Sequence, residues 1–288
     1  MELKYYLIEL RVQESYKNLL ILLAPFFSKK LLDLNYYQNL LLGFAALFLN
    51  SSACYIFNDI KDAGFDAFHP RKKNRPIASG KIRKSSALLF SVMLLVFSLL
   101  ISYWIGTSFL LLCLLLFLNS AAYSFLLRNI VWLDLISISL NYVFRTLAGC
   151  YLVDVVLSPW LLMGVFYISM LLALVKRREE IIILDRPELH RKTLKHYSIS
   201  IIDQAITILS TLILISYSLY TLHSPYSNNL LPFTIPLVTL IILKFIFVLK
   251  SSRGNNMIIR KVLTDNIIAI SLFTWLVVTT YLIYFNQC

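Results

Sequence analysis

The chain has 288 residues, of which 59% are hydrophobic and only 15% charged, and its mean hydropathy is +0.74. Soluble domains usually carry about 25% charged residues, so this composition excludes an ordinary soluble protein and indicates an integral membrane protein. The formal net charge of +12 would also fit a nucleic-acid-binding protein, but the positions of the charges argue against that class.

Nine stretches are apolar enough, at about 20 residues each, to cross a bilayer as helices. We expect them at about 17–34, 36–59, 85–105, 107–126, 132–154, 159–175, 199–222, 231–250 and 263–286. The first is the weakest, because it is short and Pro25 interrupts it. The sequence therefore predicts an all-α integral membrane protein, with one domain over residues 1–288 that is a bundle of nine transmembrane helices around a central cavity.

Lysine and arginine are distributed unequally between the two sides of this bundle. If the N-terminus is cytoplasmic and the nine helices alternate, all of the 27 basic residues except Lys29, Lys30, Arg145 and Lys244 fall on cytoplasmic segments. This asymmetry follows the positive-inside rule, and it explains the net charge without nucleic acid. We therefore predict a multi-pass protein of the inner (plasma) membrane, with its active site on the cytoplasmic side, in loops at about 58–84 and 176–198.

A polar cluster, N-D-x-x-D-x-x-x-D, lies at the end of the second predicted span. It consists of Asn58, Asp59, Asp62 and Asp66. Positions 58, 62 and 66 share one face of a helix, whereas Asp59 points about 100° away. Carboxylate and amide oxygens suit Mg²⁺, which takes its other ligands from phosphate and water. The cluster predicts a metal–diphosphate site with Asp59, Asp62 and Asp66 as candidate catalytic residues; a solvated helix end with capping carboxylates is the alternative.

Basic residues near this cluster suit the phosphates themselves. Lys72 and Arg75 follow it in a basic stretch, and Tyr55 precedes Asn58 by about one turn. The second loop begins with Lys176-Arg177-Arg178 and has no second carboxylate ladder. These three bases are therefore candidate phosphate ligands, although they would also anchor a helix end at lipid headgroups.

Three further bases lie at or within the predicted helices. Arg128 is the only charge in the turn between the fourth and fifth helices, and Arg145 lies inside the fifth. An intramembrane arginine should face the interior and pair with an anion, either a lipid phosphate or a buried acid such as Asp154. Lys17 precedes the first apolar run, where it can reach headgroups or a phosphate. The cysteines and histidines show no spacing that predicts a disulfide or a zinc site.

At these residues the chain resembles the UbiA-type prenyltransferase superfamily, and within it the decaprenyl-phosphate phosphoribosyltransferase branch. The aspartate motif marks the superfamily, whereas the K-R-R-x-E run and the missing second aspartate ladder are similar to the phosphoribosyl branch. The stretches that carry the resemblance are 17–20, 24–25, 55–59 through 69–70, 75–80, 122–124, 133–134, 144–149, 158–160 and 176–180.

The resemblance implies a specific reaction. The enzyme would transfer 5-phosphoribosyl from phosphoribosyl diphosphate to a polyprenyl phosphate, releasing diphosphate with Mg²⁺ as cofactor, in cell envelope biogenesis. The donor would sit between the two long loops, with Mg²⁺ held by Asn58 and Asp62 and with Asp66 near. Its phosphates would be held by Lys17, Tyr55, Lys72, Arg75, Lys176 and Arg177 or Arg178. The lipid phosphate would be held by Arg128 and Arg145.

Two other functions fit parts of the sequence. A prenyltransferase that moves a prenyl group from its diphosphate to an aromatic acceptor shares the first motif, but it would normally need a second aspartate cluster. A non-enzymatic membrane transporter or lipid-binding protein would explain the nine helices but not the metal ladder. The sequence therefore favours the phosphoribosyltransferase.

Overall fold

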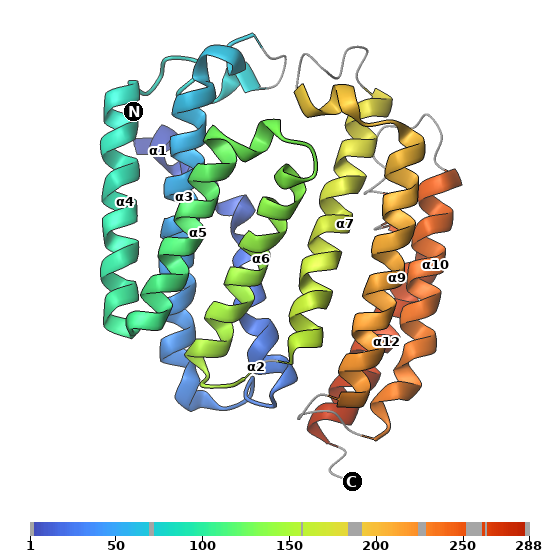
Figure 1. The fold of residues 1–288 in the computed structure, drawn as a ribbon. Coiled ribbons are helices and arrows are strands. Elements are labelled where there is room, and N and C mark those ends of the chain that lie inside the picture. The colour runs from blue at the N-terminus through green and yellow to red at the C-terminus, as the bar shows by residue number, and fades with distance from the viewer. Residues whose placement is uncertain are drawn as a thin grey trace. The chain divides into compact units, whose positions relative to one another are not determined.

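The computed structural model of the chain describes residues 3–68, 72–156, 158–183, 192–223, 229–251, 261–262 and 264–285. Ten α-helices account for most of these residues (Figure 1). They are α1 (Leu3–Glu9), α2 (Leu23–Phe27), α3 (Tyr37–Asp66), α4 (Lys84–Ile105), α5 (Thr107–Phe125), α6 (Leu133–Leu152), α7 (Pro159–Ile183), α9 (Ile199–His223), α10 (Ile235–Ser251) and α12 (Asn266–Tyr284). Short 3₁₀ helices join several of them. The all-helical prediction is confirmed.

Eight helices in the described part of the chain are long and apolar enough to cross a membrane. They are Leu34–Asp66, Lys84–Ile105, Thr107–Phe125, Leu133–Leu152, Pro159–Ile183, Ile199–His223, Leu231–Ser251 and Asn266–Tyr284. Each coincides with one of the last eight predicted spans. Together they confirm a multi-pass integral membrane protein.

The first predicted span differs from the expectation. Residues 17–34 do not form one continuous α-helix; instead the 3₁₀ helix η1 (Val12–Leu22) leads into the five-residue α2. Pro25 has no N–H to donate, so it lies within the first turn of a new helix rather than inside a longer one. Lys29, with φ of 63°, then turns the chain away after α2. The prediction of a long helix here was wrong for this reason.

The η1–α2 segment nevertheless runs antiparallel along α3. Three contacts show this course. Arg11 bonds to Asp59 near the end of α3, and Asn18 accepts a hydrogen bond from Ser51 in the middle of α3. The Ile21 side chain lies beside Gly43, nearer the start of α3. A 3₁₀ helix rises about 2.0 Å per residue, against about 1.5 Å in an α-helix. Eleven residues of η1 and five of α2 therefore reach about 30 Å, close to the thickness of a bilayer core.

Two other helices extend beyond their predicted ends. α3 continues through Asp66, so the whole aspartate motif lies on one helix, and α7 continues through Ile183, so Lys176–Glu180 are helical rather than looped. Hydropathy marks where an apolar run stops, whereas a helix continues as long as its backbone bonds are made. Residues 69–71 of the first predicted loop and 184–191 of the second lie outside the described residues.

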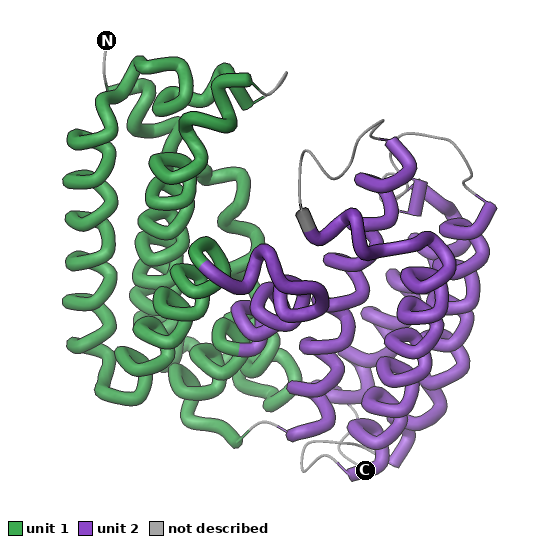
Figure 2. The backbone as a smooth tube through the Cα atoms, turned by 45° about the horizontal axis from the view of Figure 1, so that its top comes forward, with its two compact units in different colours: residues 1–125, 144–156 green, residues 126–143, 157–288 purple. Residues whose placement is uncertain are grey.

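The residues group into two compact units (Figure 2). Unit 1 contains residues 1–125 and 144–156, and unit 2 contains residues 126–143 and 157–288, so α6 contributes to both. Unit 1 has apolar clusters around Leu47 and around Ile56, and unit 2 has one around Leu174. Each unit thus has its own core, and the single functional domain over 1–288 stays a prediction.

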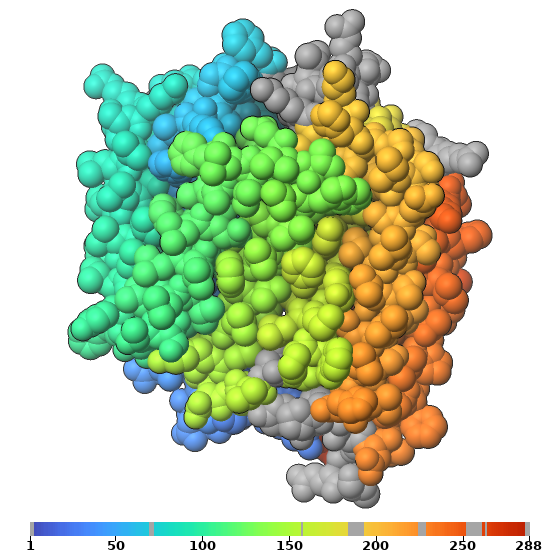
Figure 3. All heavy atoms as spheres, in the orientation of Figure 1, coloured from blue at the N-terminus to red at the C-terminus, as the bar shows by residue number. Residues whose placement is uncertain are grey.

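Helix α4 shows how a membrane helix packs in unit 1. Two of its serines face α3: Ser91 and Ser98 donate to the Ala53 and Ala46 carbonyls at 2.9 and 2.8 Å. Its large apolar side chains, such as Leu89 and Phe97, are exposed, and α4 lies on the surface of unit 1 in Figure 3, in teal. Small residues let membrane helices approach closely, while the apolar side chains meet lipid.

Lys30, one of the exceptions to the charge asymmetry, supports the end of α6. Its Nζ donates to the Val153 and Asp154 carbonyls at 2.7 and 3.3 Å, just past the last residue of α6. It also lies 4.7 Å from the centroid of the Tyr36 ring. A cation at a helix C-terminus satisfies carbonyls that have no partner in the helix, so this lysine has a structural reason for its position.

Gly149 on α6 is expected to tolerate no larger side chain. A Cβ there would lie 2.2 Å from the Ile21 carbonyl oxygen, a backbone atom that cannot rotate away. Gly149→Ala should therefore push the η1–α2 segment off α6 and lower the free energy of unfolding by about 2–3 kcal/mol. Thermal unfolding in detergent measures this loss. Gly164→Ala is the matched control, because nothing lies within 4 Å of its Cβ, and an equal loss in both variants would contradict the packing described.

Candidate active site

The two buried carboxylates of the aspartate motif share one arginine. Arg75 Nη1 donates to Asp59 Oδ1 at 2.9 Å and to Asp66 Oδ2 at 2.6 Å. Both aspartates are about 4% exposed. They are seven residues apart on α3, close to two full turns, so they project from nearly the same side of the helix. Lys72, in the 3₁₀ helix η3 (Lys72–Asn74), adds a second cation 3.7 Å from Asp66 Oδ1.

Two further bases of unit 1 surround Tyr55, one turn before Asn58. Lys17 Nζ lies 3.4 Å from the Tyr55 hydroxyl and also pairs with Glu14. Arg11 lies 5.2 Å from the centroid of the Tyr55 ring and pairs with Asp59. The structure thus brings together Lys17, Tyr55 and Asp59, and it adds Arg11, which the sequence interpretation did not select.

Arg11 has an unusual backbone conformation. Its φ of 50° and ψ of 49° lie in the left-handed region, which few residues other than glycine adopt. Such strain persists only where the surrounding contacts hold it, and here the contacts are the ion pair with Asp59 and the ring of Tyr55. The sequence carried one signal for this role, an isolated arginine before the first apolar run, but nothing in the spacing showed that it reaches Asp59.

Asn58 and Asp62, the predicted metal ligands, are half-buried and one turn apart on α3. Asn58 Oδ1 accepts a hydrogen bond from the Ser124 hydroxyl of α5. Among the described residues, no three His, Cys, Asp or Glu side chains are grouped closely enough to hold a metal ion by themselves. Mg²⁺ commonly takes only one or two carboxylates and completes its shell with phosphate and water. The donor set therefore fits Mg²⁺ bound together with a diphosphate, and these ligand roles stay predictions.

Glu9 is a second residue that sequence reasoning missed. It is buried at the end of α1, and its Oε1 accepts a hydrogen bond from the Ile77 N–H at 3.3 Å. Burial, and then the nearby Asp59 carboxylate, raise the pKa of Glu9 to about 7. An acid with this pKa is only about half ionised near neutral pH, whereas an ordinary glutamate is fully charged. No sequence pattern linked position 9 to the aspartate motif.

Replacing Glu9 with glutamine should make stability less dependent on pH. The pKa of Glu9 is higher in the folded state than its ordinary 4.5. Its contribution to the free energy of unfolding is therefore fully present below about pH 4.5 and is lost as pH rises through about 7. Glu9→Gln should therefore match the parent near pH 4.5 and be more stable at pH 8, by on the order of 2 kcal/mol. Thermal unfolding at both pH values tests this; parallel pH profiles for the two proteins would contradict it.

In unit 2, two of the three predicted phosphate ligands of α7 are buried and paired with acids. Arg177 Nε lies 3.3 Å from Asp134 Oδ2, and Arg178 Nε donates to Asp203 Oδ1 at 2.7 Å. Lys176 is exposed. Arg178 Nη1 is buried and has no hydrogen-bond partner among the described residues. Arg128, in the 3₁₀ helix η4 (Leu127–Asn129), is half-buried. The substrate contacts of all four bases remain predictions.

Arg145 lies in the interior of unit 1, as expected of an arginine within a membrane span. Its Nε donates to Asn18 Oδ1 at 2.8 Å and its Nη2 to Ser51 Oγ at 3.1 Å. It therefore joins α6 to η1 and to α3. The contact on α3 is at Ser51, about two turns before the aspartate motif. Binding of a lipid phosphate by Arg145 stays a prediction.

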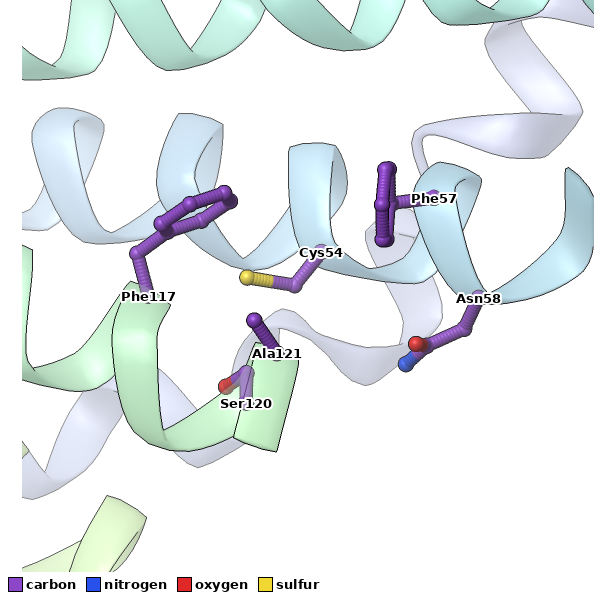
Figure 4. A pocket seen from close by; sticks show the side chains of 6 residues that line it. All are labelled: Cys54, Phe57, Asn58, Phe117, Ser120 and Ala121. Atoms are coloured by element: carbon purple, nitrogen blue, oxygen red, sulfur yellow. The ribbon is translucent and has the colours of Figure 1, made fainter. Parts of the chain in front are cut away.

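A small recess lies between α3 and α5, next to Asn58. About 160 Å³ of empty space is lined by Cys54, Phe57, Asn58, Phe117, Ser120 and Ala121 (Figure 4). Cys54 projects from α3 toward Ser120 and Ala121 of α5 in this view. The recess is too narrow to hold even a water molecule, so it marks the seam between the helices rather than a substrate pocket.

Two known enzymes are similar in sequence to this chain over most of its length. The chain is 29% identical over 226 residues to the decaprenyl-phosphate phosphoribosyltransferase of Mycolicibacterium smegmatis, covering 77% of this chain and 71% of that protein. It is 28% identical over 245 residues to the enzyme of the same name from Corynebacterium glutamicum, covering 80% and 73%. Both alignments include most of each protein, so the likeness is not confined to one motif.

The fold also matches a solved structure. A UbiA homolog from Archaeoglobus fulgidus, determined with GPP and Mg²⁺ bound, aligns with a TM-score of 0.72 at 18% identity, covering 95% of this chain and 99% of that one. At this identity the match shows the fold alone. The model of the UbiA prenyltransferase family matches residues 21–263, which is most of the chain. The chain therefore belongs to the UbiA prenyltransferase family.

Proposed function

We propose that the chain transfers 5-phosphoribosyl from phosphoribosyl diphosphate to a polyprenyl phosphate and releases diphosphate, with Mg²⁺ as cofactor. The observation that carries this proposal is the gathering of four bases, Arg11, Lys17, Lys72 and Arg75, around the end of α3. A group of cations such as this one suits a highly phosphorylated ligand. The likeness to two decaprenyl-phosphate phosphoribosyltransferases over most of the chain supports the choice of donor and acceptor.

The charges of unit 1 suit the difficult step, the departure of diphosphate from C1 of ribose. Arginine has five N–H donors, so Arg75 can hold Asp59 and Asp66 through Nη1 and present other donors to phosphate oxygens. Arg11, Lys17 and Lys72 would add positive charge around the same ligand, and Tyr55 would donate its hydroxyl. Mg²⁺, held by Asn58 and Asp62 with Asp66 near, would supply further neutralisation of the leaving group.

The acceptor needs no general base. A lipid phosphate is already an anion at neutral pH, so its oxygen can attack C1 directly as diphosphate leaves, and inversion at that carbon is expected. This accounts for a site in unit 1 that is rich in cations. Arg145 and Arg128 are the bases we assign to the lipid phosphate, and Lys176, Arg177 and Arg178 to donor phosphates; the polyprenyl tail would lie along apolar helices.

We also propose that the protein crosses the membrane nine times, with its N-terminus and active site on the cytoplasmic side of the inner membrane. The η1–α2 segment supports an additional crossing before α3, because it runs along α3 from Asp59 to Gly43 and reaches about 30 Å. With this crossing included, the basic residues fall mainly on one side, as the positive-inside rule requires.

A transfer assay tests the reaction. Membranes that contain the chain would be given labelled phosphoribosyl diphosphate, Mg²⁺ and a polyprenyl phosphate, with membranes lacking the chain as the control. The proposal predicts label in the lipid fraction, dependent on both Mg²⁺ and acceptor. Turnover only with a prenyl diphosphate and an aromatic acceptor would contradict it and support the ordinary prenyltransferase.

A further inference from the structure

The end of α5 is attached to α3 on both sides of Asn58. Phe57 and Phe125 pack edge to face, with ring centroids 5.7 Å apart. Lys61 donates to the Ser124 carbonyl, and its Nζ lies 4.2 Å from the centroid of the Phe125 ring. Between these contacts, the Ser124 hydroxyl donates to Asn58 Oδ1. The contacts of Ser124 and Lys61 have no part in the reaction proposed above.

Lys61 fixes the position of Ser124. Ser124 and Phe125 are the last two residues of α5, where the helix leaves carbonyls without intrahelical partners. The Lys61 ammonium supplies both a donor and a positive charge to this negative end of the helix dipole. The ring of Phe125 holds the same ammonium by a cation–π contact. Ser124 therefore meets Asn58 from a supported backbone rather than from a loose helix end.

The Ser124 hydroxyl has one proton and two acceptors within reach. One is Asn58 Oδ1, and the other is the Ser120 carbonyl, 2.9 Å away in the preceding turn of α5. Rotation about the Cβ–Oγ bond moves the proton between them without moving any heavy atom. The Asn58 oxygen has two lone pairs, so the hydroxyl can orient the amide through one while a cation takes the other.

We propose that Ser124 is a positioning residue, which orients the Asn58 amide oxygen toward Mg²⁺, and that Lys61 holds Ser124 in place. The inference rests on the proposed function, since it assumes that Asn58 is a metal ligand. Groups that hydrogen-bond to a metal ligand fix its orientation, and their loss typically lowers metal affinity about 10–100-fold. The loss should appear in metal affinity, whereas the maximal rate at saturating metal should change little.

Metal binding measured directly separates this role from a general structural one. Mn²⁺ would be titrated into the detergent-solubilised full-length chain with inorganic diphosphate, and free Mn²⁺ followed by electron paramagnetic resonance. Ser124→Ala should weaken Mn²⁺ binding about 10–100-fold. Ser124→Thr, which keeps the hydroxyl, should bind nearly as the parent does, and Lys61→Met should lie between them.

Ser102→Ala is the matched control, because Ser102 is a buried serine of unit 1 that donates to the Ser98 carbonyl one turn back, on α4. Its Mn²⁺ affinity should equal that of the parent. Suppose that Ser124→Ala and Lys61→Met bind Mn²⁺ as the parent does, while Asn58→Ala binds it more weakly. That result would overturn the positioning role of Ser124 but would leave the proposed metal site intact. Parent-like binding by Asn58→Ala and Asp62→Ala as well would overturn the proposed metal site itself. If Ser124→Ala does not fold, Lys61→Met, compared with the parent and Asn58→Ala, decides the question.

Discussion

Replacing Asp62 with asparagine is expected to lower Mg²⁺-dependent phosphoribosyl transfer by on the order of 10²–10³-fold. The change removes one negative charge and replaces a carboxylate ligand by a weaker amide oxygen, one turn from Asn58 on α3, and it keeps the size of the side chain. Because position 62 is half-buried on a helix whose packing lies mainly on other positions, the folded state should survive. Initial rates across a range of Mg²⁺ concentrations, with thermal unfolding of the same preparations, measure both quantities.

Asp33→Asn is the matched control for this variant. Asp33 lies just before the start of α3, at the end of the helix away from Asp62. It caps the short 3₁₀ helix η2 (Leu34–Tyr36) by accepting a hydrogen bond from the Asn35 N–H, and asparagine can also fill this role. Its rate should equal that of the parent protein. A near-normal rate for Asp62→Asn and Asp62→Ala at ordinary Mg²⁺ concentrations would exclude a ligand role for Asp62.

Removing Arg75 should produce the largest loss of stability among the bases of the site. Asp59 and Asp66 are both buried, and Arg75 Nη1 bonds to each of them. Breaking a buried ion pair leaves a desolvated charge, and here one change weakens two pairs. Arg75 is itself partly exposed, so we expect Arg75→Ala to lower the free energy of unfolding by about 2–4 kcal/mol and to abolish most of the transfer activity.

Two variants show whether this loss comes from the shared pairs. Arg75→Lys keeps the charge but lacks the planar guanidinium, so its stability should lie between those of the alanine variant and the parent. Arg83→Ala removes an exposed arginine at the start of α4 and should change stability by less than about 0.5 kcal/mol. Equal stability of Arg75→Ala and Arg83→Ala would contradict the shared ion pairs.

The spans after the first could be predicted because bilayer thickness demands a long apolar run, and hydropathy records such runs directly. The segment at 12–27 could not be predicted as it is. A 3₁₀ helix spans the same distance with fewer residues, and no apolar period identified it. The ends of α3 and α7 were placed too early, because helices continue into charged sequence.

The residues of the candidate site also fall into two groups: those that local sequence could select and those that only the fold brings together. Asp59, Asp62 and Asp66 could be selected because they lie near one another in sequence, and charge alone selected Lys72 and Arg75. Arg11 meets Asp59 across 48 residues, and Ser124 meets Asn58 across 66. Only the antiparallel course of η1 along α3, and the packing of the end of α5, create these contacts. Local sequence patterns contain no information about such pairings.

In the proposed reaction, the end of α3 holds a divalent cation on the diphosphate of the donor. A structure of the protein determined with phosphoribosyl diphosphate and Mn²⁺, with the ion located by its anomalous signal, tests this most directly. We expect the ion to contact the Asn58 amide oxygen, an Asp62 carboxylate oxygen and the diphosphate. An ion bound with the donor at another place, with the side chains of Asn58 and Asp62 turned away from it, would show that α3 does not hold the metal.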